Sequence, residues 1–338
     1  MIKCTLFFGN FFLGKSGTKS ISQKLIDNLD SENGNYLIGS NSKNKFLRVF
    51  EIIYKTFFYN YQNIHVDVFS DKAFNIAILV VCLNKIKKKK LILNLRGGRL
   101  QEFYLKNKLN KIKFQFIFRN ADHIISPSKF LSTFFNSVGH DVKYFPNYIN
   151  LEHFPYKGDL VINNKLLWVR AFHEIYNPKD AVFTLSHLIE KIPDATLTMI
   201  GPDKGELKEV IQLIDELHLT SNISILGPIK NEELYQYFHS HSVLINTTSY
   251  ESFGQSLLEA ASCGCPIVSN SVGEIPLLWK DNKDIMLSRL NDPRDMAKKI
   301  YFLMSNHSLI KKIIKNAHEK SGDYEWSNMK KSWATLLT

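Results

Sequence analysis

Two glutamates in the second half of the chain, Glu251 and Glu259, have the type and spacing to bind sugar hydroxyls. They lie in the segment 243–279, VLINTTSYESFGQSLLEAASCGCPIVSNSVGEIPLLW, where an apolar strand pattern gives way to a polar loop and then to helical spacing. Glu251 should precede this helix, and Glu259 should lie more than one turn inside it. The first N–H groups of a helix attract phosphate, and Gly254 lets the backbone approach a ligand closely. The same spacing also fits two solvated glutamates on an ordinary amphipathic helix.

The elements that position this segment follow a strand, loop and helix order along the whole chain. At 338 residues, 44% hydrophobic and 22% charged, the chain is long enough for two globular domains. Strand patterns occur in both halves, at 3–8, 65–69, 91–95, 123–126, 166–170, 197–200, 223–226 and 243–246. A connector rich in turn residues, 145–159, separates the two series. The order predicts an α/β fold of two doubly wound domains with ligands at the carboxyl ends of the strands.

The segment with the two glutamates resembles the signature of family 4 glycosyltransferases, the glycosyl transferases group 1. Ten positions match this signature: Glu251, Phe253, Gly254, Glu259, Ala260, Ala261, Gly264, Pro266, Ile267 and Val268. The resemblance extends to RNADHIISPSKFL (119–131), LLWVRAF (166–172) and the tail YEWSNMKKSW. It implies the GT-B fold, in which two Rossmann-like domains face a central cleft. We expect an acceptor-binding domain at 1–155, a nucleotide-sugar-binding domain at 156–322 and a terminal helix at 323–338 that crosses back to the first domain.

The resemblance also implies site residues. Glu259 is expected to bind the ribose diol, Glu251 the donor sugar, and Arg170 the diphosphate, including the charge that the leaving group gains. The backbone at Phe253, Gly254 and Gln255 is expected to donate to the sugar and phosphate. The loop with Pro228 and Ile229 is expected to frame the base.

Two segments depart from the family pattern. The Lys-Gly that usually follows the arginine is replaced by the longer HEIYNPKD, so Lys179 is the candidate partner for the donor, or an exposed first-turn lysine. The loop that often carries a histidine here reads LRGGR, and Arg96 and Arg99 are candidates for binding an acidic acceptor, for binding the donor or for a structural role.

The segment GNFFLGKS (9–16) satisfies the phosphate-loop pattern G-x4-G-K-S. Read alone it predicts a P-loop NTPase or kinase. The bulky Phe11, Phe12 and Leu13 fit poorly around phosphate, and Asp67 lies inside its strand instead of following it as a magnesium ligand. We therefore expect a glycine loop near the donor or the acceptor, with Gly14 and Gly17 as candidate contacts of the donor.

The family resemblance implies a retaining, metal-independent glycosyltransferase without a cofactor. Its donor would be a UDP- or GDP-linked sugar, and its acceptor a glycan or lipid-linked molecule in cell-surface polysaccharide or lipopolysaccharide synthesis. No D-x-D triplet or metal-ligand spacing is visible in the sequence. A sugar-nucleotide epimerase or a phosphorylase of the same fold remains an alternative.

Charge is distributed unevenly along the chain. Residues 1–155 hold 23 Lys and Arg against 10 Asp and Glu, a formal charge of +13, although the whole chain carries only +11. Aromatic residues at 46–61 and lysines at 85–90 and 104–116 predict docking on an anionic membrane, or else a buried helix with solvated lysines. No nucleic-acid-binding module is visible. We expect a cytoplasmic protein at the inner face of the plasma membrane, with its four cysteines reduced, buried and inert.

Overall fold

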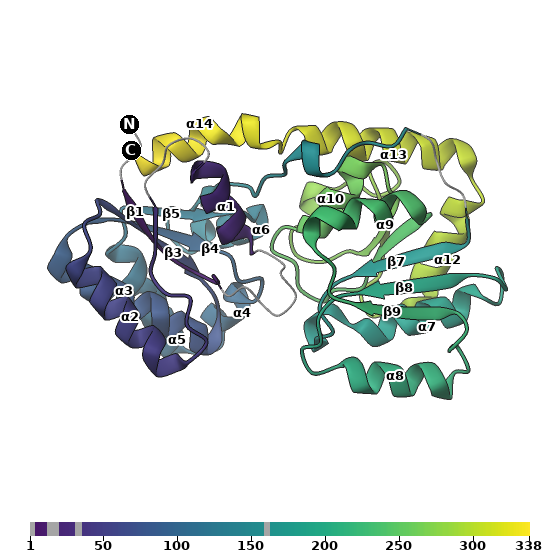
Figure 1. The fold of residues 1–338 in the computed structure, drawn as a ribbon, viewed down its shortest axis with the longest axis horizontal. Coiled ribbons are helices and arrows are strands. Elements are labelled where there is room, and N and C mark those ends of the chain that lie inside the picture. The colour runs from purple at the N-terminus through teal and green to yellow at the C-terminus, as the bar shows by residue number, and fades with distance from the viewer. Residues whose placement is uncertain (1–3, 12–19, 31–35, 159–162) are drawn as a thin grey trace. The chain divides into compact units, whose positions relative to one another are not determined.

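The computed structural model describes residues 4–11, 20–30, 36–158 and 163–338, which form two compact units (Figure 1). The first unit comprises the described residues up to Asn147 together with Met329–Thr338, and the second comprises those from Tyr148 to Asn328. Each unit contains one parallel six-stranded sheet with helices on both faces. The predicted α/β class with two doubly wound sheets is confirmed.

The first sheet has the strand order β2-β1-β3-β4-β5-β6. Its strands are β1 (Thr5–Phe8), β2 (Tyr36–Ile38), β3 (Asn63–Val68), β4 (Lys90–Leu95), β5 (His123–Ser126) and β6 (Lys143–Tyr144). Its helices are α1 (Ile21–Asp30), α2 (Lys45–Phe58), α3 (Phe74–Lys87), α4 (Leu100–Leu105), α5 (Lys108–Arg119) and α6 (Lys129–Ser137). The continuous burial of β1 and β3 reflects a parallel sheet covered on both faces.

The second sheet has the order β12-β11-β10-β7-β8-β9. Its strands are β7 (Lys165–Val169), β8 (Thr196–Ile200), β9 (Ile223–Gly227), β10 (Val243–Asn246), β11 (Ile267–Asn270) and β12 (Met286–Ser288). Its helices are α7 (Pro178–Leu188), α8 (Leu207–Glu216), α9 (Leu234–Ser240), α10 (Gln255–Cys263), α11 (Ile275–Leu278), α12 (Pro293–Met304) and α13 (His307–Gly322). Helix α14 (Trp326–Leu337) begins in the second unit and ends in the first.

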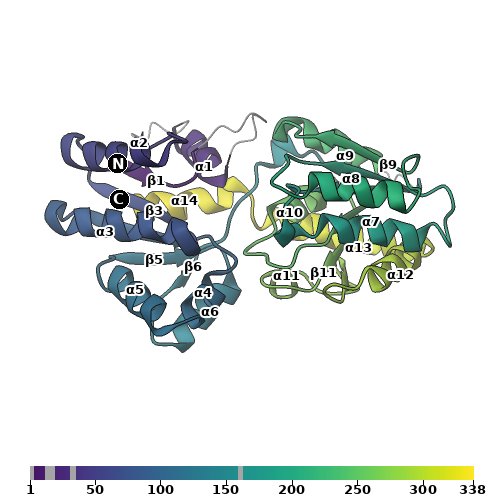
Figure 2. The same cartoon turned by 90° about the horizontal axis from the view of Figure 1, so that it is seen from below.

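Alternating residues of β7 pack into two apolar cores, one on each face of the second sheet. Leu166 and Trp168 of β7 pack with α7, α8 and α12 on one face, whereas Leu167 packs with α9 and α10 on the other. Figure 2 shows the helices of the second unit from a second direction. Helix α10 is buried from its second residue onward, and the loop 247–254 connects the carboxyl end of β10 to its first turn.

The end of α14 belongs to the core of the first unit. Trp333 packs edge-on against Phe145 at 4.7 Å between ring centroids and lies 5.9 Å from the ring of His65. The side chain of Asn63 on β3 donates to the carbonyl of Leu337 at 2.7 Å. The last residues of the chain therefore pack in the same unit as its first strand, β1.

Candidate active site

The strand order of the second sheet reverses between β7 and β10. Strands β8 and β9 continue outward from β7, and β11 and β12 continue outward from β10. The connections that leave two such strands run to opposite faces of the sheet, which opens a crevice at their carboxyl ends. Arg170 follows β7 and Asn246 ends β10, so both stand at this switch point.

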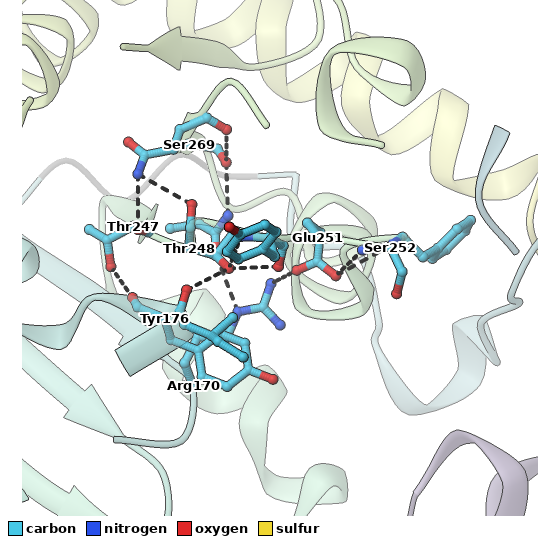
Figure 3. Close-up of polar contacts among 12 residues, drawn as sticks. Arg170, Tyr176, Thr247, Thr248, Glu251, Ser252 and Ser269 are labelled. Atoms are coloured by element: carbon cyan, nitrogen blue, oxygen red, sulfur yellow. Dashed lines mark hydrogen bonds and ion pairs between the residues drawn. The ribbon is translucent and has the colours of Figure 1, made fainter. Parts of the chain in front are cut away.

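Arg170 is held in place by three groups at the switch point (Figure 3). Its Nε donates to Oδ1 of Asn246 at 3.1 Å, and one terminal nitrogen donates to Oε2 of Glu251 at 2.6 Å. The guanidinium also lies over the ring of Tyr176, 5.4 Å from its centroid. Burial raises the pKa of the Tyr176 phenol, the charge of Arg170 partly opposes this rise, and the charge of Glu251 adds to it. The arginine is thus fixed by a carboxylate, an amide and an aromatic face.

Glu251 organises the loop before α10. While Oε2 accepts from Arg170, Oε1 accepts from the backbone N–H groups of Ser252 and Phe253 at 3.1 and 3.3 Å. The Arg170 and Glu251 side chains are only 13% and 11% exposed. The sequence predicted both residues as site residues, and the structure brings them into direct contact, which the sequence did not predict.

Two glycines let neighbouring loops approach these residues. A Cβ on Gly273 would lie 2.2 Å from the carbonyl oxygen of Glu251, and Gly273 has a positive φ of 53°. A Cβ on Gly201, which follows β8, would lie 1.7 Å from the carbonyl oxygen of Arg170. Any side chain at either position would displace the backbone of a site residue, so these glycines fix the geometry of the pair.

Helix α10 begins where the sequence predicted, with Gly254 as the N-cap residue. Glu251 precedes the helix, and Glu259 lies inside it and is 4% exposed. Asn231, which follows the Pro228 and Ile229 loop after β9, donates to Oε1 of Glu259 at 3.2 Å. The two segments predicted to bind the base and the ribose therefore lie side by side.

A polar network that was not predicted from the sequence connects the ends of β10 and β11 to the loop that carries Tyr176 (Figure 3). Thr247 donates from Oγ1 to the carbonyl of Tyr176 at 2.7 Å and accepts from the indole of Trp168 at 3.0 Å. Asn246 donates to Oγ of Ser269 at 2.9 Å, and the side chain of Asn270 donates to the carbonyl of Thr247 at 2.9 Å. The available signal was the polar ending of two apolar runs, VLINTTS and IVSN.

Other predicted donor contacts have partners of their own. Lys179 lies in the first turn of α7, with its ammonium 3.2 Å from Glu206 and its side chain 42% exposed. The side chain of Gln255 donates to the carbonyl of Tyr148 at 3.1 Å. Asn177 is the N-cap residue of α7 and Pro178 its first residue, but the Asn177 side chain accepts no hydrogen bond from the helix and instead donates to Oγ of Ser249 at 2.7 Å. Asn177 therefore connects α7 to the loop after β10.

The predicted acceptor residues lie in the first unit. Arg96 follows β4 and is 9% exposed; its Nε donates to Oδ1 of Asp67 at 2.7 Å and its NH1 to Asn147 at 3.0 Å. The other oxygen of Asp67 accepts from Ser22. Arg99 pairs with Glu102 at 3.6 Å on a half-exposed surface. Gly14 and Gly17 lie outside the described residues.

A cavity of about 320 Å³ opens at the switch point of the first sheet, where β1 and β3 are neighbours and the strand order reverses. Its apolar lining includes Phe8, Ile52 and Phe69, and among the described residues its charged lining consists of Arg48 and Asp67. Deeper in the same sheet His65 is fully buried, and burial lowers its pKa to about 4. The cavity thus combines an apolar wall with one cation and one anion.

The cysteines differ from the prediction at two positions. All four are free thiols, but Cys82 is exposed and Cys4 is half-buried. Burial raises the pKa of Cys265 to about 12 and also raises that of Cys263. The apolar run that contains Cys82 covers more than one face of α3, so part of it is directed away from the core.

Among the described residues, no three His, Cys, Asp or Glu side chains converge as metal ligands would. Within the same part of the chain, no helix has both the length and the apolar character needed to cross a bilayer.

Comparison with known proteins supplies the family. Residues 160–320 match the family model described as "Glycosyl transferases group 1". The chain is 28% identical over 254 residues to an uncharacterized glycosyltransferase of Methanocaldococcus jannaschii, covering 72% of this chain and 68% of that protein. It is 24% identical to N-acetyl-alpha-D-glucosaminyl L-malate synthase of Bacillus anthracis, covering 59% of this chain and 51% of that enzyme.

Solved structures match the fold over almost the whole chain. The Anabaena HepE protein in complex with UDP and glucose is similar, with a TM-score of 0.82, 16% identity and 99% of both chains covered. Sucrose-phosphate synthase from Thermosynechococcus elongatus gives a TM-score of 0.79 at 15% identity, covering 99% of this chain and 98% of that one. Residues 160–320 thus match the glycosyl transferases group 1, and the chain is a glycosyltransferase with the GT-B fold.

Proposed function

We propose that this glycosyltransferase transfers a sugar from a UDP- or GDP-linked donor to a glycan or lipid-linked acceptor in cell-surface polysaccharide or lipopolysaccharide synthesis. The observation that carries the proposal is the set of groups at the switch point of the second sheet. Arg170 supplies a fixed positive charge, the first turn of α10 supplies N–H donors, and Glu259 supplies a buried carboxylate. A nucleoside diphosphate sugar needs these three groups for its diphosphate and its ribose.

In the proposed reaction the bond between the anomeric carbon and the diphosphate oxygen breaks. The acceptor hydroxyl forms the new bond to that carbon on the same face and loses its proton to the departing diphosphate. Negative charge grows on the leaving oxygen, and Arg170 with the helix N-terminus stabilises it most strongly in the transition state. Because these groups supply positive charge to the diphosphate, we propose that the reaction requires neither a metal ion nor another cofactor.

Glu251 has two roles in this proposal. It accepts from Arg170 and from two backbone N–H groups, so it fixes the arginine and the loop before α10. It also stands at the position that is expected to accept hydroxyls of the donor sugar. The cavity of the first unit is the proposed acceptor site, because its apolar wall suits the lipid portion of a lipid-linked acceptor and Arg48 suits an acidic group.

A panel of sugar nucleotides tests the proposal. The purified enzyme is incubated with UDP- and GDP-linked sugars in EDTA, and the anomeric configuration of the product is read by NMR. Transfer or slow donor hydrolysis with retention is expected. Inversion, or turnover that needs added Mn²⁺ or Mg²⁺, would overturn the mechanistic part. If no transfer occurs, formation of an epimerised donor would identify an epimerase, and formation of a sugar 1-phosphate would identify a phosphorylase. ATP hydrolysis without transfer would identify an NTPase.

A further inference from the structure

Helix α2 in the first unit carries four aromatic side chains on its solvent side. Phe46, Phe50, Tyr54 and Phe58 are spaced every fourth residue, which places them on one face of the helix. They are 88%, 64%, 45% and 75% exposed, and the Tyr54 ring lies 5.0 Å from that of Phe58 and 6.1 Å from that of Phe50. We name these four residues the α2 aromatic stripe.

The opposite face of α2 already packs against the core of its own unit. Ile52 and Thr56 are buried, and α2 contacts α3. Lys55 donates to the carbonyl of Ile38 at 2.8 Å, and Glu51 accepts from Ser40 at 2.6 Å. The orientation of α2 is therefore fixed by these contacts, and the stripe does not belong to the core of this unit. In Figure 2, α2 lies at the margin of the first unit.

Positive charge surrounds the stripe. Lys43 and Lys45 are exposed at the N-terminal end of α2, and the first turn of this helix has no acidic residue. Cations at a helix N-terminus oppose the helix dipole, so these lysines do not stabilise the helix itself. At the end of the neighbouring α3, exposed Ile86 stands between Lys85 and Lys87. The surface thus combines exposed aromatic rings with lysine cations on the neighbouring helices α2 and α3.

We propose that the α2 aromatic stripe docks on an anionic lipid surface. The rings enter the boundary between headgroups and acyl chains, and the lysines contact the anionic headgroups. A second copy of this chain is a poorer partner, because pairing two such faces would bring their lysines together. This inference is independent of the donor site, since every residue of the surface lies in the first unit and outside the candidate site.

Vesicle sedimentation tests this surface. The wild-type protein is mixed with phosphatidylcholine vesicles that do or do not contain phosphatidylglycerol, at ~0.1 M and ~1 M salt, where the Debye length is ~10 Å and ~3 Å. We expect binding to the anionic vesicles, weakened at high salt. The triple variant F46S/F50S/F58S and the charge-reversed variant K43E/K45E should each bind at least about tenfold more weakly.

Matched variants in the second unit control for residue type and charge. Phe302 is 50% exposed on α12, and Lys311 and Lys312 are exposed on α13, so F302S and K311E/K312E should bind vesicles like the wild type. All variants should keep the wild-type thermal unfolding midpoint and rate of donor hydrolysis, which separates failure of this surface from failure of the catalytic proposal. Unchanged vesicle binding by both α2 variants would overturn the proposal. The proposal would also be overturned if light scattering showed that the wild-type protein is a dimer and that F46S/F50S/F58S is a monomer.

Discussion

The contact between Arg170 and Glu251 allows a quantitative prediction about stability. Replacing Glu251 by Gln keeps the size of the side chain but removes its charge. Three hydrogen bonds then lose a charged acceptor, one from Arg170 at 2.6 Å and two from the backbone at Ser252 and Phe253. Arg170 keeps Asn246 and the Tyr176 ring as its remaining partners in this group.

The magnitude follows from the burial of the pair. Removing one partner of a fully buried ion pair costs about 3–5 kcal/mol, and a single hydrogen bond to a charged group contributes about 1.5–3 kcal/mol. The two side chains are still 13% and 11% exposed. We therefore expect Glu251→Gln to lower the free energy of unfolding by about 2–3 kcal/mol, near the lower end of these values. At roughly 2–4 °C per kcal/mol for a unit of this size, the unfolding midpoint of the second unit should fall by about 4–12 °C.

A double-mutant cycle measures the interaction itself. Glu251→Gln, Arg170→Met and the double variant are unfolded in a calorimeter, and the transition of the second unit is compared. The account predicts a coupling free energy of about 1–3 kcal/mol. The exposed pair Lys179–Glu206, at 3.2 Å, is the matched control and should couple by less than about 1 kcal/mol. Additive effects of Glu251→Gln and Arg170→Met, within about 0.5 kcal/mol, would refute the reasoning.

Three further predictions concern Glu259, His65 and the cysteines. Glu259→Ala should weaken calorimetric affinity for the nucleoside diphosphate by roughly ten- to more than a hundredfold, since a charged hydrogen bond to ribose is worth about 1.5–3 kcal/mol; affinity within twofold of wild type would remove this role. The pKa of His65 is about 4 in the fold and about 6.5 in the unfolded chain, so the unfolded state binds more protons between these values. The stability from neutral His65 should therefore be present above pH ~6.5 and decline by up to about 3 kcal/mol toward pH ~4. His65→Gln should lack this dependence, so it should appear in the difference between the wild-type and variant stability curves. A thiol reagent at mildly alkaline pH should modify exposed Cys82 first and leave Cys263 and Cys265 unmodified until the protein unfolds, as mass spectrometry would report.

Most of the fold could be predicted from the sequence because its local patterns agree with the tertiary structure. The segment 243–279 shows this: the strand, the loop with Glu251 and the helix with Glu259 all form as predicted. A buried parallel strand is continuously apolar, and a helix that packs on a sheet is periodic, so each pattern identifies its own element.

The contacts between distant segments could not be predicted in this way. Arg170 and Glu251 are 81 positions apart, and they meet because β7 and β10 are neighbours in the sheet, which no local pattern specifies. The support of Glu251 by Gly273 depends on a loop beyond the next strand. For residues 46–61 the sequence left a buried helix and a membrane-facing one open, because periodicity does not tell which side faces the core. The structure shows α2 with both a buried face and an exposed aromatic face.

The most direct test of the account is a calorimetric comparison of nucleoside diphosphates with the corresponding monophosphates. UDP, GDP and ADP are titrated into the wild-type protein, followed by the monophosphate of the base that binds best. We predict that the diphosphate binds more tightly, because Arg170 and the first turn of α10 contact the diphosphate, and that Arg170→Ala removes most of this difference. If Arg170→Ala kept the full preference, or if no nucleoside diphosphate bound the wild type, the site assigned here would be wrong.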